Sequence, residues 1–178
     1  MNAPKASLSG FTISLLLISG PVVAAPMTNV TCKDYVEVTD NYRPQYLATI
    51  EGYDQSGKKV SEAVDLGGIV TESRSLVNKC RQMPTAKVHD VKSKHKANSG
   101  KKFNVTKSTC RDFIVLGEDV QPVAAYYALG YDKTGKLQGG IIETGYVQSP
   151  IADLVEVCKK EPKASFMTKA REWFRRHI

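Results

Sequence analysis

Histidine and the residue clusters of catalysis are scarce in this chain of 178 residues. The histidines number three, at His89, His95 and His177. None has a serine, cysteine or carboxylate companion at a spacing typical of a catalytic group, and no Gly-rich phosphate loop or metal-spaced cluster is present. We therefore expect a protein that is not an enzyme, with no catalytic residue, no metal site and no cofactor.

Long apolar runs are also missing, except for one near the N-terminus. The run Phe11–Ala25 follows Lys5, the single charged side chain in the first 30 residues. It is too short to favour a membrane-spanning helix, and Val22 and Ala24 stand at the positions that a signal peptidase reads. We expect residues 1–24 to be a cleaved secretory signal, which would place the mature chain in a bacterial periplasm, where disulfides persist.

Cysteine is limited to four residues, and no CxxC pair is present, so neither a redox motif nor a zinc knuckle is supported. The spacing of 48 from Cys32 to Cys80 recurs from Cys110 to Cys158. Sliding residues 31–86 onto 109–164, a shift of 78, keeps many identities without a gap. They are Thr31 with Thr109, Cys32 with Cys110, Asp34 with Asp112, Pro44 with Pro122, Gly52-Tyr53-Asp54 with Gly130-Tyr131-Asp132, Gly57-Lys58 with Gly135-Lys136, Gly67 with Gly145, Leu76-Val77 with Leu154-Val155, Cys80 with Cys158 and Pro84 with Pro162. The chain is a tandem duplication of a small domain.

The repeat also selects among the three pairings that four cysteines allow. Pairing Cys32 with Cys80 and Cys110 with Cys158 gives both copies the same covalent plan. Closing a loop of this length stabilises a fold by about 4 kcal/mol. Such a contribution matters in a domain of about 55–70 residues, where a hydrophobic core alone is marginal.

Charge is concentrated between the two cysteine pairs. One acid, Asp90, stands there among eight basic residues: Arg81, Lys87, Lys92, Lys94, Lys96, Lys101, Lys102 and Lys107. Because Lys92–Gly100 has no apolar periodicity, we expect residues 87–107 to be a flexible basic linker. The alternative is an arm that attracts anions such as lipopolysaccharide, nucleic acid or acidic proteins. No aromatic residue alternates with the lysines to stack on bases, so we expect no nucleic-acid partner.

The local signals inside each repeat are mostly helical. Thr31 with Asp34, and Thr109 with Asp112, form a variant of the capping box. A helical face recurs at Ile151, Leu154, Val155 and Cys158 after the N-cap pair Ser149-Pro150, with a weaker echo at Leu76, Val77 and Cys80. A last helix is expected from near Ser165, with Phe166, Ala170 and Trp173 facing inward.

The centre of each repeat is open to two interpretations. The segment Val123–Tyr131 after Pro122 fits either a buried helix or the first strand of a hairpin that returns through Ile141-Ile142. Periodicity does not separate them, while the leading proline and the alanine content favour the helix.

In their order these motifs resemble the HdeA/HdeB family of periplasmic acid-stress chaperones. The resemblance rests on Thr-Cys-x-Asp-aromatic, a Pro-led apolar segment, and a helix that ends in Cys158-Lys-Lys-x-Pro before a Phe- and Trp-bearing helix. Residues 109–173 carry the full pattern; residues 31–86 lack the aromatic last helix, since Val88–Lys96 is basic instead. The resemblance implies a small all-α fold with one disulfide clamping two helices, a homodimer near neutral pH, and ATP-independent holding of unfolded proteins at very low pH.

The expected organisation is therefore all-α, with two small tandem helical domains, each with one intra-domain disulfide, joined by a basic linker. After the signal come an HdeA-like repeat over 25–86, the linker over 87–107 and a second repeat over 108–178. The expected function is an acid-stress holdase for acid-denatured periplasmic proteins, acting as a pseudo-dimer of its repeats or as a homodimer. The alternative is a constitutive module that docks on an anionic envelope surface through its linker without a pH switch.

Acid would act on such a chaperone through its carboxylates. If Asp34 and Asp112 titrate below about pH 4 in the folded state, folding loses stability as pH falls through those values. With all carboxylates neutral, the net charge of the mature chain approaches about +28. Self-repulsion would then loosen the domains and expose apolar segments to a client. We expect the client surface at Tyr42, Tyr46, Leu47, Ile50, Tyr53, Val123, Tyr126, Tyr127, Leu129 and Tyr131.

Overall fold

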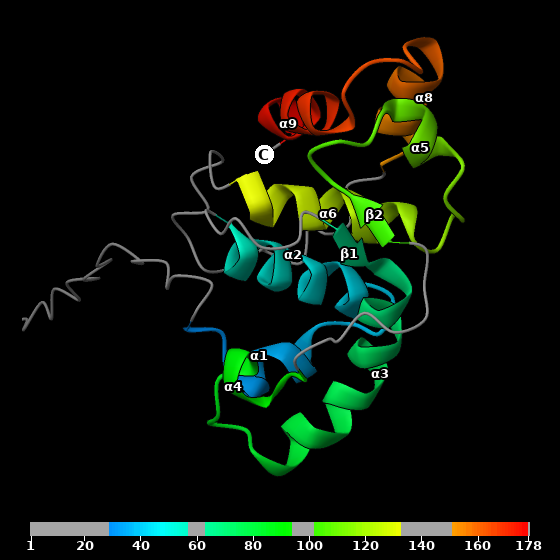
Figure 1. Cartoon of the computed structure of the whole chain (residues 1–178). Coiled ribbons are helices and arrows are strands. Elements are labelled where there is room, and N and C mark those ends of the chain that lie inside the picture. Colours follow the sequence, from blue (N-terminus) through cyan, green and yellow to red (C-terminus); the bar gives the residue numbers. More distant parts are fainter. Residues whose placement is uncertain (1–28, 57–62, 94–101, 133–150, 178) are drawn as a thin grey trace, which may run out of the picture.

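The computed structural model describes residues 29–56, 63–93, 102–132 and 151–177, and most of them are helical (Figure 1). The first half contains α1 (Cys32–Glu37), α2 (Arg43–Gln55), β1 (Ala63–Asp65), α3 (Leu66–Gln82) and α4 (Val88–Val91). The second half contains β2 (Lys102–Asn104), α5 (Cys110–Ile114), α6 (Gln121–Asp132), α8 (Ala152–Lys160) and α9 (Phe166–His177). The all-α expectation is confirmed, with one short two-stranded sheet added. The predicted signal, the returning strand at Ile141-Ile142 and the cap at Ser149-Pro150 lie outside the described residues.

Both short leading helices begin with the predicted capping box. The carboxylate of Asp34 accepts a hydrogen bond from the backbone N–H of Thr31 at 2.9 Å, and the Thr31 hydroxyl accepts from the Asp34 N–H at 3.2 Å. Thr109 and Asp112 repeat this geometry at 2.8 and 3.4 Å. Each box satisfies two N–H groups that the first turn of a helix leaves without a partner. None of the described helices has the length and apolar character needed to cross a membrane.

The central segment of each repeat is a helix, which decides between the two interpretations of the sequence. Both α2 and α6 carry a proline in their first turn, Pro44 and Pro122, where a missing N–H leaves no helical bond unmade. Buried residues run without interruption from Tyr46 to Gly52 in α2 and from Val123 to Gly130 in α6. A helix that is buried on all sides shows no amphipathic period, which is why periodicity could not identify these two.

The predicted disulfide pairing is confirmed in both halves. Cys32–Cys80 joins α1 to α3 and Cys110–Cys158 joins α5 to α8, with Cα–Cα distances of 4.7 and 4.8 Å. All four cysteines are fully buried. Backbone hydrogen bonds recur at equivalent positions as well. The N–H of Val88 donates to the carbonyl of Val30, and 78 residues later the N–H of Phe166 donates to the carbonyl of Ser108. The shift of 78 residues therefore holds in space and reaches the last helix of each half.

The predicted flexible linker differs from the structure at both of its ends. Its first residues form α4, anchored by the completely buried Val88. Its last residues form β2 and the turn after it, anchored by the buried Phe103 and Val105. These isolated apolar residues order the chain although the composition around them is basic. Residues 94–101, the middle of the predicted linker, lie outside the described residues.

A small sheet joins the two halves. β1 of the first half pairs antiparallel with β2, so that Val64 lies opposite Phe103. Both side chains are buried and belong to the same hydrophobic core. This pairing was not predicted, because three residues are too few to show a strand period.

The two halves meet along α2 and α6, which form the most extensive contact between any two described elements (Figure 1). Two glycines in equivalent positions, Gly52 and Gly130, lie at the closest point. A Cβ atom on Gly52 would lie under 3.0 Å from the backbone oxygen of Tyr127, and one on Gly130 would lie as close to the backbone oxygen of Thr49. Only glycine lets two helix backbones approach so closely. One hydrophobic core runs through both halves as a result.

Replacing either glycine by alanine should weaken the contact between the halves. For Gly52→Ala and Gly130→Ala we expect a loss of about 1–3 kcal/mol in the free energy of unfolding at pH 7, because the added methyl overpacks the contact. Urea denaturation followed by circular dichroism measures it. The matched control is Gly67→Ala, whose Cβ would have only an ordinary contact of 3.7 Å with the Asp65 carboxylate. Equal stability of all three variants would contradict the close approach.

Candidate functional site

The residues predicted to bind clients lie along the two central helices that join the halves. The structure places five of them on or next to α2 (Tyr42, Tyr46, Leu47, Ile50 and Tyr53) and five on α6 (Val123, Tyr126, Tyr127, Leu129 and Tyr131). Seven of the ten are buried, and Tyr42, Tyr53 and Tyr131 are partly buried against the same core. In this structure the predicted client surface is therefore part of the hydrophobic core. A client could reach it only if α2 and α6 separated from each other or from the helices packed on them.

The tyrosines of this core are held in their neutral form. Burial raises the pKa of Tyr46 to about 12, and it raises the pKa of Tyr126 and Tyr127 further. For Tyr127 the negative charges of Glu51 and Asp54 add to the effect of burial. The tyrosines therefore do not respond to acid, but carboxylates of the first half lie close enough to α6 to influence it.

Each central helix ends in a carboxylate that ties it to the last helix of its own half. Asp54 at the end of α2 accepts from the ring Nδ1 of His89 at 2.9 Å and lies 3.2 Å from Nζ of Lys92. Asp132 at the end of α6 accepts from Nε and Nη2 of Arg171 in α9 at 2.9 and 2.5 Å. The two acids are equivalent in the repeat, so this anchor is present in both halves in a different form.

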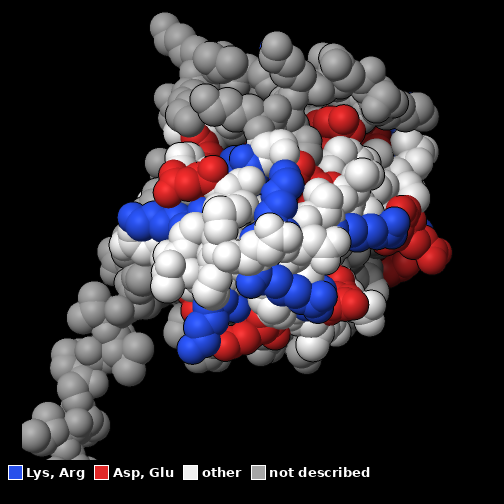
Figure 2. All heavy atoms as spheres, turned by 90° about the horizontal axis from the view of Figure 1, so that it is seen from below, with Lys and Arg blue, Asp and Glu red and all other residues white. Residues whose placement is uncertain are grey.

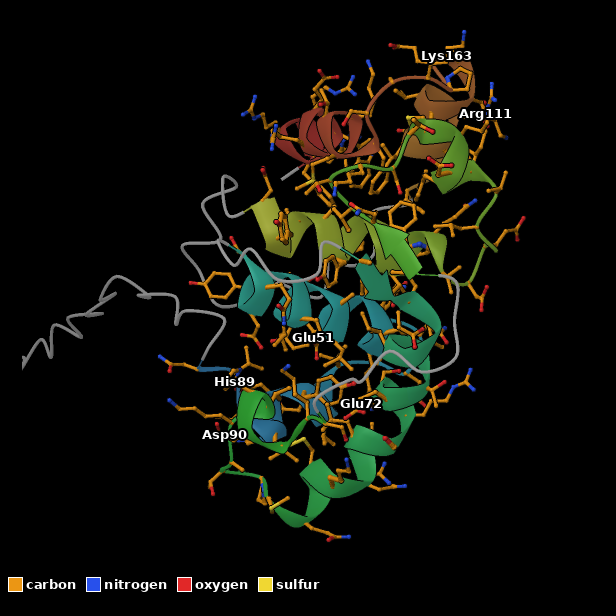
Figure 3. All side chains as sticks on the ribbon, viewed as in Figure 1. Glu51, Glu72, His89, Asp90, Arg111 and Lys163 are labelled. Carbon is orange, nitrogen blue, oxygen red and sulfur yellow. A yellow bond between two sulfur atoms is a disulfide. The ribbon has the colours of Figure 1, made fainter. Side chains whose placement is uncertain are left out.

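A second carboxylate, Glu51, shares the same lysine in the first half. Its Oε1 accepts from Nζ of Lys92 at 2.8 Å, and the two side chains are only 11% and 10% exposed. Burial alone would lower the pKa of Lys92, but the charges of and hydrogen bonds to Glu51 and Asp54 outweigh it and raise that pKa. Figure 3 shows Glu51 and His89 turned toward the space between α2 and α4. Protonating these carboxylates would leave a lysine nearly buried without a counter-charge.

Glu72 on α3 closes the same region from another side. It is buried, its carboxylate accepts from the backbone N–H of Ser93 at 2.7 Å, and Nζ of Lys79 lies 3.9 Å away (Figure 3). The short chain that follows α4 is therefore held by carboxylates from both α2 and α3. An anchor built from carboxylates is one that acid can release.

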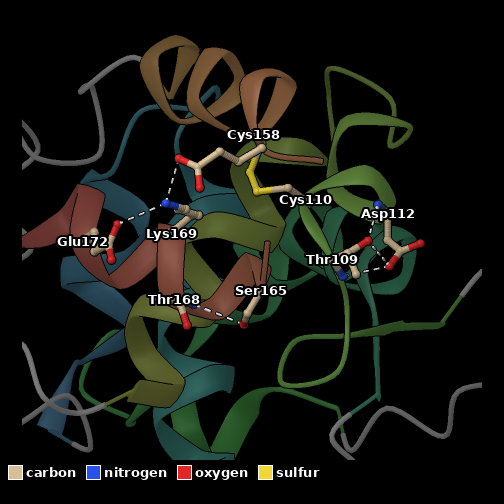
Figure 4. The surroundings of a disulfide bond; sticks show 9 residues. Thr109, Cys110, Asp112, Cys158, Ser165, Thr168, Lys169 and Glu172 are labelled. Atoms are coloured by element: carbon tan, nitrogen blue, oxygen red, sulfur yellow. Dashed lines mark hydrogen bonds and ion pairs between the residues drawn. A yellow bond between two sulfur atoms is a disulfide. The ribbon is translucent and has the colours of Figure 1, made fainter. Parts of the chain in front are cut away.

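The predicted switch residues, Asp34 and Asp112, lie elsewhere. They are exposed and belong to the capping boxes at the starts of α1 and α5, not to the contact between α2 and α6. Figure 4 shows the second of these boxes, formed by Thr109 and Asp112. The backbone N–H and then the hydroxyl of Thr109 lower the pKa of Asp112. A lowered pKa means that Asp112 stabilises the fold above its unfolded value of about 3.9 and that this contribution is lost as pH falls through the folded value.

A cleft of about 720 Å³ opens where the halves meet near the start of α2. Arg43, Arg74 and Arg81 line it from the first half, and Glu118 and Asp119 line it from the second. Asp40 of the first half also lines it and pairs with Arg43, so that the cleft holds three arginines and three carboxylates at neutral pH. In acid the carboxylates would lose their charge while arginine keeps it.

On the face that Figure 2 shows, the basic side chains of the described residues do not form one continuous patch. Figure 2 shows lysines and arginines separated by neutral surface, with acidic side chains among them and at the edges. Within the segment, Lys92 is turned inward to Glu51, and Lys87 donates to the Asn29 side chain at 3.1 Å.

Several residues of this site received no role from the sequence, namely Glu51, Gly52, Asp54, Lys92, Gly130, Asp132 and Arg171. The available signal was the tripeptide Gly-Tyr-Asp, which recurs in register at 52–54 and 130–132. In both copies the glycine allows α2 and α6 to approach each other, and the aspartate forms an ion pair with a basic side chain in or just after the last helix. The repeat thus singled out the glycine and aspartate positions, but it did not show which residues they contact.

Comparison with known proteins agrees with this architecture. The model of a family described as the HdeA/HdeB family matches twice, over residues 9–90 and 92–168. Proteins named "Probable acid stress chaperone HdeA" from Brucella ovis, Brucella canis and Brucella suis are each 37% identical over 76 residues, which cover 43% of this chain. The matched part spans 66% of the length of those relatives. No solved structure matches the chain.

The two family matches divide the chain as the disulfides do, with one cysteine pair in each. The length of the match to the curated relatives, 76 residues, is also close to the period of the repeat. This chain belongs to the HdeA/HdeB family, whose domain it carries in two copies.

Proposed function

We propose that this protein is an ATP-independent periplasmic chaperone that opens in acid and holds acid-denatured proteins. The observation that carries the proposal is the burial of the aromatic residues of α2 and α6 behind ion pairs made by Glu51, Asp54 and Asp132. The name of the curated relatives, acid stress chaperone, supports the same function.

Acid would act first on these ion pairs. As the carboxylates become neutral, Lys92 and Arg171 keep their charge and lose their partners. Removing one partner of a buried pair destabilises a fold by about 3–5 kcal/mol; we expect less for Arg171, whose side chain is 35% exposed and can turn to water. The capping carboxylate Asp112 loses its contribution over the same fall in pH.

Repulsion would then separate the halves while the disulfides limit unfolding within each. The mature chain would carry about +28 with every carboxylate neutral. Charge of this size opposes the compact state and keeps an open complex soluble. Because each disulfide lies inside one half, neither prevents α2 from leaving α6. The aromatic core of the contact would become the client surface.

The second candidate is an envelope-docking module without a pH switch. It is favoured by one observation, the eight basic residues between Cys80 and Cys110. Such binding would be present at pH 7 and would weaken with added salt, so salt dependence separates it from the chaperone.

The decisive experiment is light scattering of an acid-denatured client at pH 2 and at pH 7, with and without the oxidised protein lacking residues 1–24. We expect suppression of aggregation at pH 2 and none at pH 7, because the aromatic core is covered at neutral pH. Absence of suppression at pH 2, from a protein shown to be folded at pH 7, would exclude the chaperone function.

A single chain should be the unit in solution at pH 7, since α2 and α6 of one chain already cover each other. We expect the mass of one chain from size-exclusion chromatography with multi-angle light scattering. A mass of two chains or more would mean that the family's homodimer is retained on top of the internal contact.

Removing the aromatic rings from α6 should reduce holding. For Tyr126→Ala with Tyr127→Ala we expect at least a several-fold rise in the chaperone concentration needed for half-suppression at pH 2, because large apolar surface is lost. The matched control, Tyr126→Phe with Tyr127→Phe, keeps the rings and should behave like the parent. Intact protection by the alanine variant would remove these residues from the client surface.

A further inference from the structure

We propose that the two halves open in sequence, the first half at a higher pH than the second, and that the face of α2 beneath α4 is the first client-binding surface. The surface would take extended apolar segments of denatured proteins. This inference rests on the proposed function for its client, but the order of opening can be measured without one.

The last helices of the two halves differ at every core-facing position. In α9 the buried residues are Phe166, Met167, Ala170, Trp173 and Phe174. A shift of 78 places Val88, His89, Lys92, His95 and Lys96 at the equivalent positions of the first half. Apart from Val88, every position of the first half that corresponds to a buried residue of α9 holds a lysine or a histidine. In the first half the described helix also ends after four residues, at Val91.

The central helix of the first half carries the matching change. Glu51 in α2 stands where α6 has the buried Leu129. Its partner Lys92 stands where α9 has the buried Ala170. An apolar pair of positions in the second half is therefore an acid and a base in the first, and the structure joins the two at 2.8 Å. The first half holds its last helix by charge where the second half holds it by apolar burial.

Every charged group around this pair acts in the same direction below about pH 4. Asp54 on α2 and Glu72 on α3 supply the remaining negative charge, while His89 on α4 and Lys79 on α3 supply positive charge; the hydroxyl of Tyr127 on α6 stays neutral. An imidazole is positively charged well below the ordinary histidine pKa of about 6.5. Carboxylates lose their charge near pH 4. Lys92, which is only 10% exposed, is then left without a counter-charge beside two more exposed cations, His89 and Lys79, and α4 is expelled.

The second half has this weakness in a milder form. Lys169 of α9 is 16% exposed and lies 2.9 Å from Glu161 and 3.6 Å from Glu172, but these two carboxylates are about half exposed, so that water reaches the ion pairs. The ring of Phe166 stacks on Phe113 with centroids 4.6 Å apart, and Phe174 meets Tyr126 edge to face at 5.7 Å. These contacts do not titrate. The ion pair between Asp132 and Arg171 does, but Arg171 is 35% exposed, so that it can be hydrated in place when Asp132 becomes neutral. We therefore expect α9 to stay packed against α5 and α6 at a pH at which α4 is released.

Release of α4 would uncover a surface suited to a client. Val88 is completely buried and its N–H bonds to the carbonyl of Val30, so its departure exposes apolar core. The face of α2 beneath it carries Glu51 and Asp54, which are neutral once protonated. A surface of apolar core residues and neutral carboxylic acids carries no negative charge. Apolar segments would bind there while the second half remains folded.

The order of opening is tested on the oxidised full chain by hydrogen exchange with mass spectrometry over a series from pH 7 to pH 2, with rates corrected for intrinsic exchange. Trp173 in α9 is the single tryptophan, so its fluorescence reports the second half independently. We expect α4 and α2 to lose protection at a pH at least one unit above the change in α9 and in Trp173. Simultaneous opening, or opening of α9 first, would overturn the proposal.

Substitutions taken from the second half test the cause. Glu51→Leu with Lys92→Ala copies Leu129 and Ala170, and we expect it to lower the opening pH of the first half toward that of the second. Asp54→Asn should raise the opening pH of the first half, while the matched Asp132→Asn should leave it unchanged. An unaltered opening pH in the double variant would overturn the role of the Glu51–Lys92 pair. If the double variant does not fold at pH 7, Glu51→Gln tests the same pair. We expect it to open at a higher pH than the parent, and an unchanged opening pH would overturn the role of the pair.

Client protection separates the two proposals. With the parent protein, protection should begin at the pH at which α4 loses hydrogen-exchange protection and before Trp173 changes. If the halves open in this order but no protection appears even at pH 2, the chaperone function is wrong and the sequential opening stands. If protection appears only when Trp173 changes, the function stands and the first-half surface is wrong.

Discussion

The closest approach in this molecule, that of α2 and α6 at Gly52 and Gly130, is the constraint on which the rest of the structure depends. Because each glycine lies against the backbone of the opposite helix, the helices share one core, and the aromatic residues around them are buried without a cover from another chain. The same approach brings the end of each helix, and the carboxylate it carries, to a defined place beside the last helix of its half.

The ion pairs at those helix ends make the attachment of the last helices dependent on pH. Hydrophobic contacts and disulfides change little between pH 7 and pH 2, whereas an ion pair exists only while its carboxylate is charged. The carboxylates of the first half are those that bury a lysine, and those of the second half leave their arginine partly in water. In the proposed opening, the response to acid depends on where the cations lie after protonation rather than on how many carboxylates the chain has.

Duplication inside one chain allows this asymmetry. In a homodimer both copies carry the same residues, so a change that makes one half more sensitive to acid makes the other so too. Here Glu51 and Lys92 differ from Leu129 and Ala170 while the disulfides, the capping boxes and the glycines are kept. The parts common to the halves hold each domain together, and the parts that differ lie at the attachment of the last helix.

The sequence by itself determined the tandem duplication, the disulfide pairing, the capping boxes and a last helix from near Ser165, because each rests on local chemistry or on identities kept at one fixed shift. It left the central segments open between helix and strand, since a fully buried helix shows no period, and it assigned residues 87–107 to a flexible linker although Val88 and Phe103 anchor its two ends. Only the tertiary structure decided that the two repeats face each other through Gly52 and Gly130 and that Lys92 turns inward to Glu51. Such pairings join residues about 40 or 80 positions apart, and no local pattern can specify which of many charged or small residues will meet.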